Sequence, residues 1–190
     1  RTGLYPNPLP FTPGLEGAGA VVGTCPDTVG FREGDRVTWT NVLGSYAESV
    51  VVPVDQAIPI PDGVATRDAA AVMLQGLTAH YLCRSTYPLR AGDTCLVHAA
   101  AGGVGLLLVQ MAKERGARVL GTVSTEEKAA LAREAGAEVI VKQTVDAERD
   151  DLVNCDAVIM GTGNYFQKES GCFRDYWDRY DYDWLKMKQE

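Results

Sequence analysis

The stretch HAAAGGVG at residues 98–105 brings three glycines together between two apolar segments. Residues 94–97 before it have the composition of a buried strand, and apolar residues across 104–111 recur at the i, i+3, i+4, i+7 spacing of a helix packed on a sheet. In such a unit, Gly102 lets the backbone approach a phosphate closely and Gly105 lets the helix lie tight against the strand, while the helix start attracts an anion. Because a strand precedes the glycines and a helix follows them, we interpret the stretch as a pyrophosphate site of a dinucleotide rather than a turn required by packing alone.

The end of the next predicted strand, in GTVSTEEK at residues 121–128, indicates which dinucleotide is bound. Sites that select NAD usually place an acid there, whereas this chain has Ser124, with Lys128 one helical turn later on the same face. A hydroxyl and an ammonium group fit the 2′-phosphate of NADP. Ser124 and Glu127 also have the spacing of a capping box, with Lys128 then a solvated helix residue, and both interpretations can hold together. Glu126 and Glu127 keep NAD open as an alternative, but the pattern favours NADP.

These two motifs lie in a region where predicted strands and helices alternate, from residue 92 to residue 160. Such alternation is typical of a parallel sheet covered by helices and predicts an α/β fold for this region. The predicted strands are residues 94–98, 117–122, 138–141 and 156–160, and the predicted helices are residues 103–115 and 125–135.

The part of the chain that precedes this region differs from it in composition. Residues 1–62 are rich in proline and glycine and contain short β-prone runs, which predicts a compact β region with tight turns. The predicted strands there are residues 18–22, 36–40, 46–52 and 57–60. An alanine-rich helical pattern follows over residues 66–87, with Thr66 as its expected N-cap and Asp68 in its first turn.

Composition limits the possible partners. The 190 residues are 46% hydrophobic and 23% charged with a net charge of −7, which predicts a soluble globular protein and argues against nucleic acid or an anionic membrane as partner. The sequence has no apolar run near membrane-spanning length and no signal-peptide pattern, and it begins with Arg rather than Met. Its five cysteines are scattered without a C-x-x-C pair, which is typical of reduced thiols in a cytoplasmic protein.

Taken together, these motifs resemble the quinone oxidoreductase, or ζ-crystallin-like, branch of the zinc-independent medium-chain dehydrogenases/reductases. The resemblance runs from residue 1 to about residue 160. It rests on the A-x-x-G-x-x-G form of residues 99–105 and on further segments. These segments are RTGLYPNPLPFTPGLEGAGAVV, GFREGDRV, GSYAE, residues 69–113 and residues 116–141.

The resemblance implies a GroES-like β-rich catalytic domain beside a Rossmann domain, with NADPH between them. It implies a partial catalytic domain with its linking helix over residues 1–87, incomplete at its start. A partial Rossmann domain over residues 88–164, incomplete at its end, and a divergent aromatic and charged tail over residues 165–190 would follow. The reaction implied is hydride transfer from NADPH to a quinone or another electron-poor unsaturated carbonyl, and a homodimer is possible.

The same resemblance assigns roles to individual residues. Tyr5 would line the substrate pocket, Thr78 would lie near the nicotinamide, and Lys128 with Ser124 would meet the 2′-phosphate. Lys142 stands where many relatives have a Tyr near the adenine-side phosphate, and it would attract that phosphate without an aromatic contact. The residues that would form the pyrophosphate loop are Ala101, Gly102, Gly103, Val104 and Gly105.

Zinc is not expected in this chain. Zinc-dependent relatives have a histidine ligand where this chain has Leu15, and they carry a closely spaced cysteine cluster that this sequence lacks. The chain has only two histidines, His80 and His98, and core packing is the default expectation for both.

Two functions therefore remain open. One is an NADPH-dependent quinone oxidoreductase. The alternative is a truncated, catalytically weak relative that binds nucleotide or a partner chain, because segments that the family carries at both ends are not found in residues 1–190.

Overall fold

A four-stranded parallel sheet positions the predicted dinucleotide motifs in the computed structural model, which describes residues 8–141 and 156–159. The strands are β4 (Thr94–His98), β5 (Arg118–Val123), β6 (Glu138–Val141) and β7 (Ala157–Ile159). Their order is β6-β5-β4-β7, so the chain steps outward from β4 to β6 and then returns to pair β7 with the other side of β4. In such sheets, ligands bind at the carboxyl ends of the strands where this reversal occurs.

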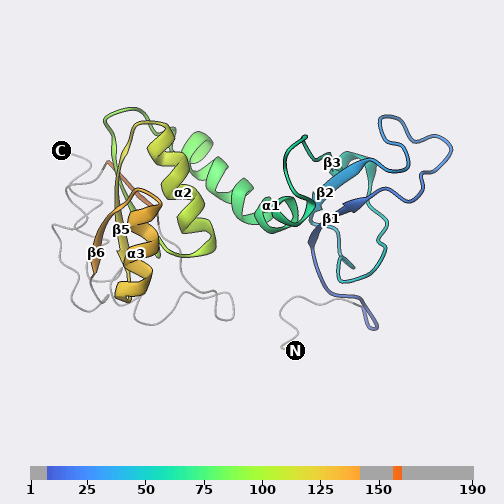
Figure 1. The fold of residues 1–190 in the computed structure, drawn as a ribbon, viewed down its shortest axis with the longest axis horizontal. Coiled ribbons are helices and arrows are strands. Elements are labelled where there is room, and N and C mark those ends of the chain that lie inside the picture. Colours follow the sequence, from blue (N-terminus) through green and yellow to red (C-terminus); the bar gives the residue numbers. More distant parts are fainter. Residues whose placement is uncertain (1–7, 142–155, 160–190) are drawn as a thin grey trace. The chain divides into compact units, whose positions relative to one another are not determined.

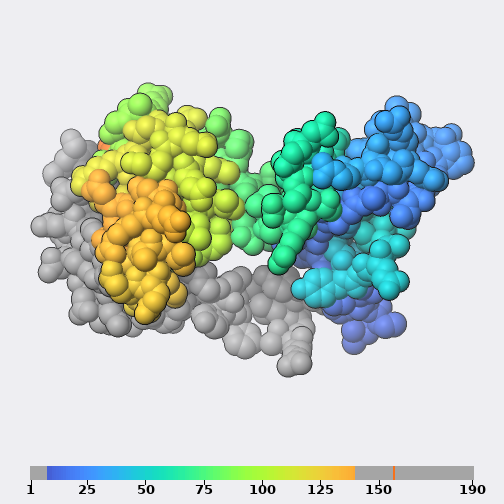
Figure 2. Space-filling view, viewed as in Figure 1, coloured from blue at the N-terminus to red at the C-terminus, as the bar shows by residue number. Residues whose placement is uncertain are grey.

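Two helices cover one face of this sheet. Helix α2 (Gly103–Glu114) connects β4 to β5, and helix α3 (Glu126–Glu134) connects β5 to β6 (Figure 1). In the space-filling view, the two helices lie side by side on the face that is shown (Figure 2). The predicted α/β region is thereby confirmed, and the ends of its elements agree with the predicted ones or differ from them by one residue.

Apolar side chains of both layers form the core of this region. Leu108 and Val109 of α2 pack against Val97 of β4 and Val119 of β5, and all four are almost completely buried. Burying each side chain of this size contributes about 1.5–3 kcal/mol relative to leaving it in water. The core therefore fixes α2, and with it the start of that helix, against the carboxyl end of the sheet.

A three-stranded antiparallel sheet forms the core of the first unit. It consists of β1 (Glu16–Ala20), β2 (Arg36–Thr40) and β3 (Ile58–Pro59), with β2 in the centre. Trp39 of β2 covers Gly17 of β1 so closely that a Cβ at Gly17 would lie 2.7 Å from the indole ring. The indole Nε1 of Trp39 donates to Ser45 Oγ at 2.9 Å, which satisfies its polar group. The expected β region is confirmed.

The predicted strand at residues 46–52 is wrong, although its alternating pattern is real. Val50 and Val52 pack against the small cluster of Val37, Trp39 and Val42, while Val51 is 91% exposed. A strand also needs a hydrogen-bonded neighbour, and none of the described strands pairs with this segment. The alternation of packed and exposed side chains therefore belongs to a segment that has no ladder of hydrogen bonds to a described strand.

The alanine-rich segment forms helix α1 (Thr66–Tyr81), which continues as one π-helical turn over Leu82–Thr86. Thr66 is the first helical residue rather than the residue before the helix, and a short 3-10 turn (Val54–Gln56) precedes it in the chain. The chain divides into two compact units, residues 1–77 and 78–190, within α1. The domain boundaries expected at residues 87 and 164 stay predictions.

Candidate dinucleotide-binding site

The predicted pyrophosphate loop connects the last residue of β4 to the first turn of α2. Gly102 is the N-cap of α2, with an extended backbone (φ −78°, ψ 170°) and no side chain to cap the helix. Its N–H donates to the carbonyl of Ala99 at 2.8 Å, which closes a tight turn over residues 99–102. The next three residues, Gly103, Val104 and Gly105, begin the helix, so their N–H groups have no acceptor within it. This is the arrangement in which a helix start accepts an anion.

Two glycines of the loop differ in how much space surrounds them. A Cβ at Gly105 would lie 2.3 Å from the carbonyl oxygen of Ala99 and 2.8 Å from that of Ala100. Gly105 therefore allows α2 to contact the loop that follows β4, whereas we expected contact with the strand itself. A Cβ at Gly102 would lie 3.2 Å from the Ala99 oxygen, and Gly102 and Gly103 are both exposed. The exposed pair leaves the backbone of residues 102 and 103 accessible from solvent.

The predicted 2′-phosphate residues lie together after β5. Lys128 Nζ donates to Ser124 Oγ at 3.1 Å, and both side chains are exposed. The interpretation of Ser124 as a helix cap is wrong, because the N-cap of α3 is Thr125, whose hydroxyl accepts from the Lys128 N–H. Because Thr125 caps the helix, the Ser124 hydroxyl is left to accept from the Lys128 ammonium group. The pair presents a hydroxyl donor and a positive charge to solvent.

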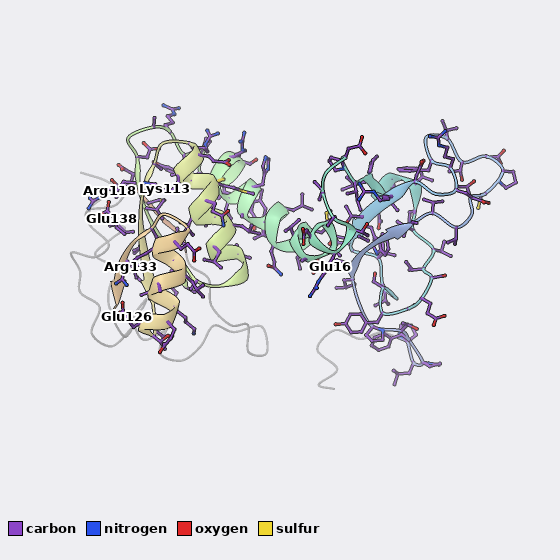
Figure 3. The ribbon with its side chains drawn as sticks, viewed as in Figure 1. Glu16, Lys113, Arg118, Glu126, Arg133 and Glu138 are labelled. Carbon is purple, nitrogen blue, oxygen red and sulfur yellow. The ribbon has the colours of Figure 1, made fainter. Side chains whose placement is uncertain are left out.

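Glu126 and Glu127, the two acids that left NAD as an alternative to NADP, each interact with another side chain of α3 or its cap. Glu126 forms an ion pair with Arg133 near the other end of α3 (Figure 3). A hydrogen bond with the Thr125 side chain lowers the pKa of Glu127. The Glu127 carboxylate is therefore ionised at neutral pH. The charge of Glu126 is compensated by the guanidinium group of Arg133.

His98, the last residue of β4, has a polar partner that the sequence did not reveal. Its Nδ1 lies 2.7 Å from the hydroxyl oxygen of Thr122 on β5, and the two residues are paired in the parallel register. His98 is half-buried, and desolvation lowers its pKa. The other histidine, His80, is exposed on α1, so the expectation of core packing is wrong for it.

The lowered pKa of His98 predicts how stability depends on pH. The unfolded chain binds a proton near pH 6.5, while the folded chain binds it only at lower pH, so the free energy of unfolding falls as pH drops below about 6.5. Chemical denaturation between pH 7.5 and 5.5 checks this, and His98→Asn, which does not titrate, should flatten the profile. His80→Asn, at the exposed histidine, is the matched control, and the profile of His98→Asn should be flatter than that of His80→Asn. Equal slopes for all three proteins would contradict the prediction.

The lowered pKa values of Glu127 and Glu138 affect the free energy of unfolding in a pH range separate from that of His98. The Arg118 guanidinium forms a bidentate hydrogen-bonded pair with Glu138 across β5 and β6, and that hydrogen bond lowers the pKa of the Glu138 carboxyl (Figure 3). Any stability that these carboxylates contribute is lost only as pH falls through folded-state pKa values below the ordinary 4.5. They therefore do not obscure the change expected from His98.

The remaining predicted site residues are Thr78, Ala101, Tyr5 and Lys142. Thr78 is half-buried in α1, and Ala101 is half-buried with its side chain packed against the core. Tyr5 and Lys142 lie outside the described residues. The roles assigned to these residues stay predictions.

Metal ligands do not cluster in the part of the chain that the structure describes. No group of three or more His, Cys, Asp or Glu side chains lies close enough there to hold a metal ion. Leu15, at the position of the histidine ligand in zinc-dependent relatives, is 52% exposed. Among the same described residues, no helix is both long and apolar enough to span a membrane.

Comparison with known proteins gives two family matches in sequence. Residues 1–62 match the alcohol dehydrogenase GroES-like domain, and residues 103–170 match a family described as zinc-binding dehydrogenase. A quinone oxidoreductase of Pseudomonas aeruginosa is 52% identical over 154 residues, which cover 80% of this chain and 46% of the relative. The chain thus spans about half the length of the curated relatives that it matches.

Solved structures agree with these matches. The quinone oxidoreductase of Pseudomonas syringae superposes with a TM-score of 0.79 at 42% identity, over 86% of this chain and 53% of that one. The Escherichia coli quinone oxidoreductase complexed with NADPH superposes with a TM-score of 0.70 at 43% identity, over 75% of this chain and 44% of that one.

Proposed function

This chain belongs to the quinone oxidoreductase branch of the medium-chain dehydrogenase/reductase superfamily, and we propose on that basis that it binds NADPH and serves hydride transfer to a quinone. Another electron-poor unsaturated carbonyl is the alternative acceptor. We further propose that the reaction requires no zinc.

The observation that carries the proposal is the geometry of the loop between β4 and α2. Gly105 has no room for a side chain against the loop backbone, while Gly102 and Gly103 are exposed at the start of an α-helix. These are the features that a pyrophosphate needs, because its charge is stabilised by free N–H groups that it can approach closely. The pair of Ser124 and Lys128 supports a 2′-phosphate and thus NADPH over NADH.

When bound, NADPH supplies a hydride that, with a proton from water, reduces a quinone to a hydroquinone. The residues of this chain would bind and orient the cofactor rather than carry out the chemistry. The loop amides at 103–105 would hold the pyrophosphate, Lys128 would neutralise the 2′-phosphate, and Thr78 and Tyr5 would border the nicotinamide and the acceptor.

Paired measurements on the 190-residue chain test this function. NADPH binding is followed by fluorescence, and NADPH oxidation is followed with 1,4-benzoquinone or 9,10-phenanthrenequinone, with the full-length Pseudomonas aeruginosa quinone oxidoreductase as positive control. We expect the chain to bind NADPH and to oxidise it when quinone is present, but more slowly than the control. The chain spans 46% of the control's length, and hydride transfer requires donor and acceptor to be held about 3–3.5 Å apart. Turnover equal to that of the control would exclude the catalytically weak alternative, and absence of NADPH binding would refute the proposal.

Zinc content is a separate prediction. The alkyl side chain of Leu15 cannot replace an imidazole ligand, so we expect purified protein to contain far less than one zinc per chain after dialysis. Elemental analysis measures this directly. Stoichiometric zinc would overturn the zinc-independent part of the proposal.

We also propose a cytoplasmic location and a possible homodimer. Cys25, Cys83 and Cys95 are free thiols, which fits a reducing compartment. Light scattering of the purified chain tests the oligomeric state.

A further inference from the structure

The end of β4 and the loop that follows it each form a hydrogen bond with Thr122 of β5. The N–H of Ala100 donates to the main-chain carbonyl of Thr122 at 3.1 Å. The side-chain hydroxyl of the same Thr122 shares a 2.7 Å hydrogen bond with His98 Nδ1. In neutral imidazole with its proton on Nε2, the hydroxyl is the donor. Thr122 thus forms hydrogen bonds with His98, where β4 ends, and with Ala100 in the loop that follows.

Packing reinforces the same junction. Ala100 is completely buried, and a Cβ at Gly121 would lie 2.8 Å from the Ala100 methyl group. The loop therefore rests directly on the backbone of β5. A larger side chain at either position would move the loop away from the strand.

The loop needs such support because its backbone is not relaxed. Ala99 has a φ of +56°, in the left-handed region that residues other than glycine seldom adopt. A conformation of this kind is strained and persists only when surrounding contacts hold it in place. The carbonyl of Ala99 accepts the Gly102 N–H, so a change at Ala99 would be passed to the start of α2.

We propose that His98 and Thr122 are positioning residues for the dinucleotide, which hold the loop so that the first-turn amides of α2 meet the pyrophosphate in one geometry. This inference rests on the proposed NADPH binding and deepens it, because it assigns a function to a hydrogen bond between two strands. Neither side chain needs to touch the ligand. Their hydrogen bond fixes the end of β4. Because the strained turn over residues 99–102 begins there, the position of that turn is fixed as well.

The test compares variants at both positions in the complete 190-residue chain. Thr122→Val keeps the shape of the side chain but removes the hydroxyl, and His98→Leu removes the imidazole. His98→Asn can still offer a polar atom to Thr122 and serves as the rescue variant. Thr94→Val, the same change at the opposite end of β4, is the matched control.

Three ligands separate positioning from a general structural effect. NADPH and NADH both contain the pyrophosphate, whereas 2′-AMP contains only the adenosine and its 2′-phosphate. We expect Thr122→Val and His98→Leu each to weaken NADPH and NADH by about 3- to 10-fold, the usual range for one lost hydrogen bond, and to leave 2′-AMP within 2-fold of wild type. The double variant should lose no more than the worse single variant, since both changes remove the same bond.

Each result has a definite meaning. Unchanged NADPH affinity in Thr122→Val and His98→Leu would overturn the inference while leaving the proposed function intact. An equal loss for NADPH and 2′-AMP, or a loss in Thr94→Val of the same size, would also overturn it, because the effect would then be general. If wild type itself binds neither NADPH nor NADH, the proposed function fails first.

Discussion

Replacing Gly105 by valine is expected to weaken NADPH binding by about 100-fold or more, the loss that two hydrogen bonds to a charged phosphate would cause. The new Cβ would lie 2.3 Å from the Ala99 oxygen and 2.8 Å from the Ala100 oxygen, both of which are backbone atoms. Neither oxygen can rotate away as a side chain would, so α2 and the loop must separate. That movement displaces the amides of residues 103–105 on which the pyrophosphate would lie.

The same substitution should also lower the free energy of unfolding. Forcing extra atoms into a well-packed contact costs about 1–3 kcal/mol. Isothermal titration with NADPH and chemical denaturation measure the two effects separately. Gly23→Val is the control, because a Cβ at Gly23 meets nothing within 4 Å and should change stability by about 0.5 kcal/mol or less. Wild-type affinity in Gly105→Val would show that the loop does not bind the cofactor.

Replacing Lys128 by alanine is the second large effect that we expect. Its ammonium group lies 3.1 Å from Ser124 Oγ, and the two together form the proposed 2′-phosphate subsite. Loss of a charge partner from a phosphate costs about 1–3 kcal/mol, which is about 5- to 150-fold in affinity. Because Lys128 is exposed, salt should reduce the effect. NADH lacks the 2′-phosphate, so its affinity should not change.

Titration of NADPH and NADH into wild type and Lys128→Ala measures the affinity of each protein for each cofactor and tests this prediction. Lys113→Ala removes the same charge from the last turn of α2, where Lys113 is close enough to Glu138 to help lower the pKa of that carboxyl. This control should retain wild-type affinity for both cofactors. Equal affinities of wild type for NADPH and NADH would refute the assigned specificity, and an equal loss of both in Lys128→Ala would indicate a different role for the lysine.

The local motifs of the site could be predicted from the sequence because each depends on neighbours along the chain. Gly102 lies between a strand and a helix, and Gly105 lies in the first turn of that helix. The apolar spacing of the helix is visible without tertiary information. Ser124 and Lys128 are four residues apart, so a helical turn brings them together. For the same reason, the strands at 36–40, 94–98 and 138–141 have the predicted bounds.

Only the tertiary structure decided the features that depend on partners distant in the chain. His98 and Thr122 meet because the parallel register of β4 and β5 pairs them, and no local pattern encodes a register. Residues 46–52 alternate as a strand should, yet pairing requires a neighbouring strand that alternation cannot supply. The cap of α3 falls on Thr125 rather than Ser124, because both hydroxyls suit a helix start and the position of the helix on the sheet selects one of them. Chemical type and spacing thus predicted the site, and long-range pairing determined how its loop is held.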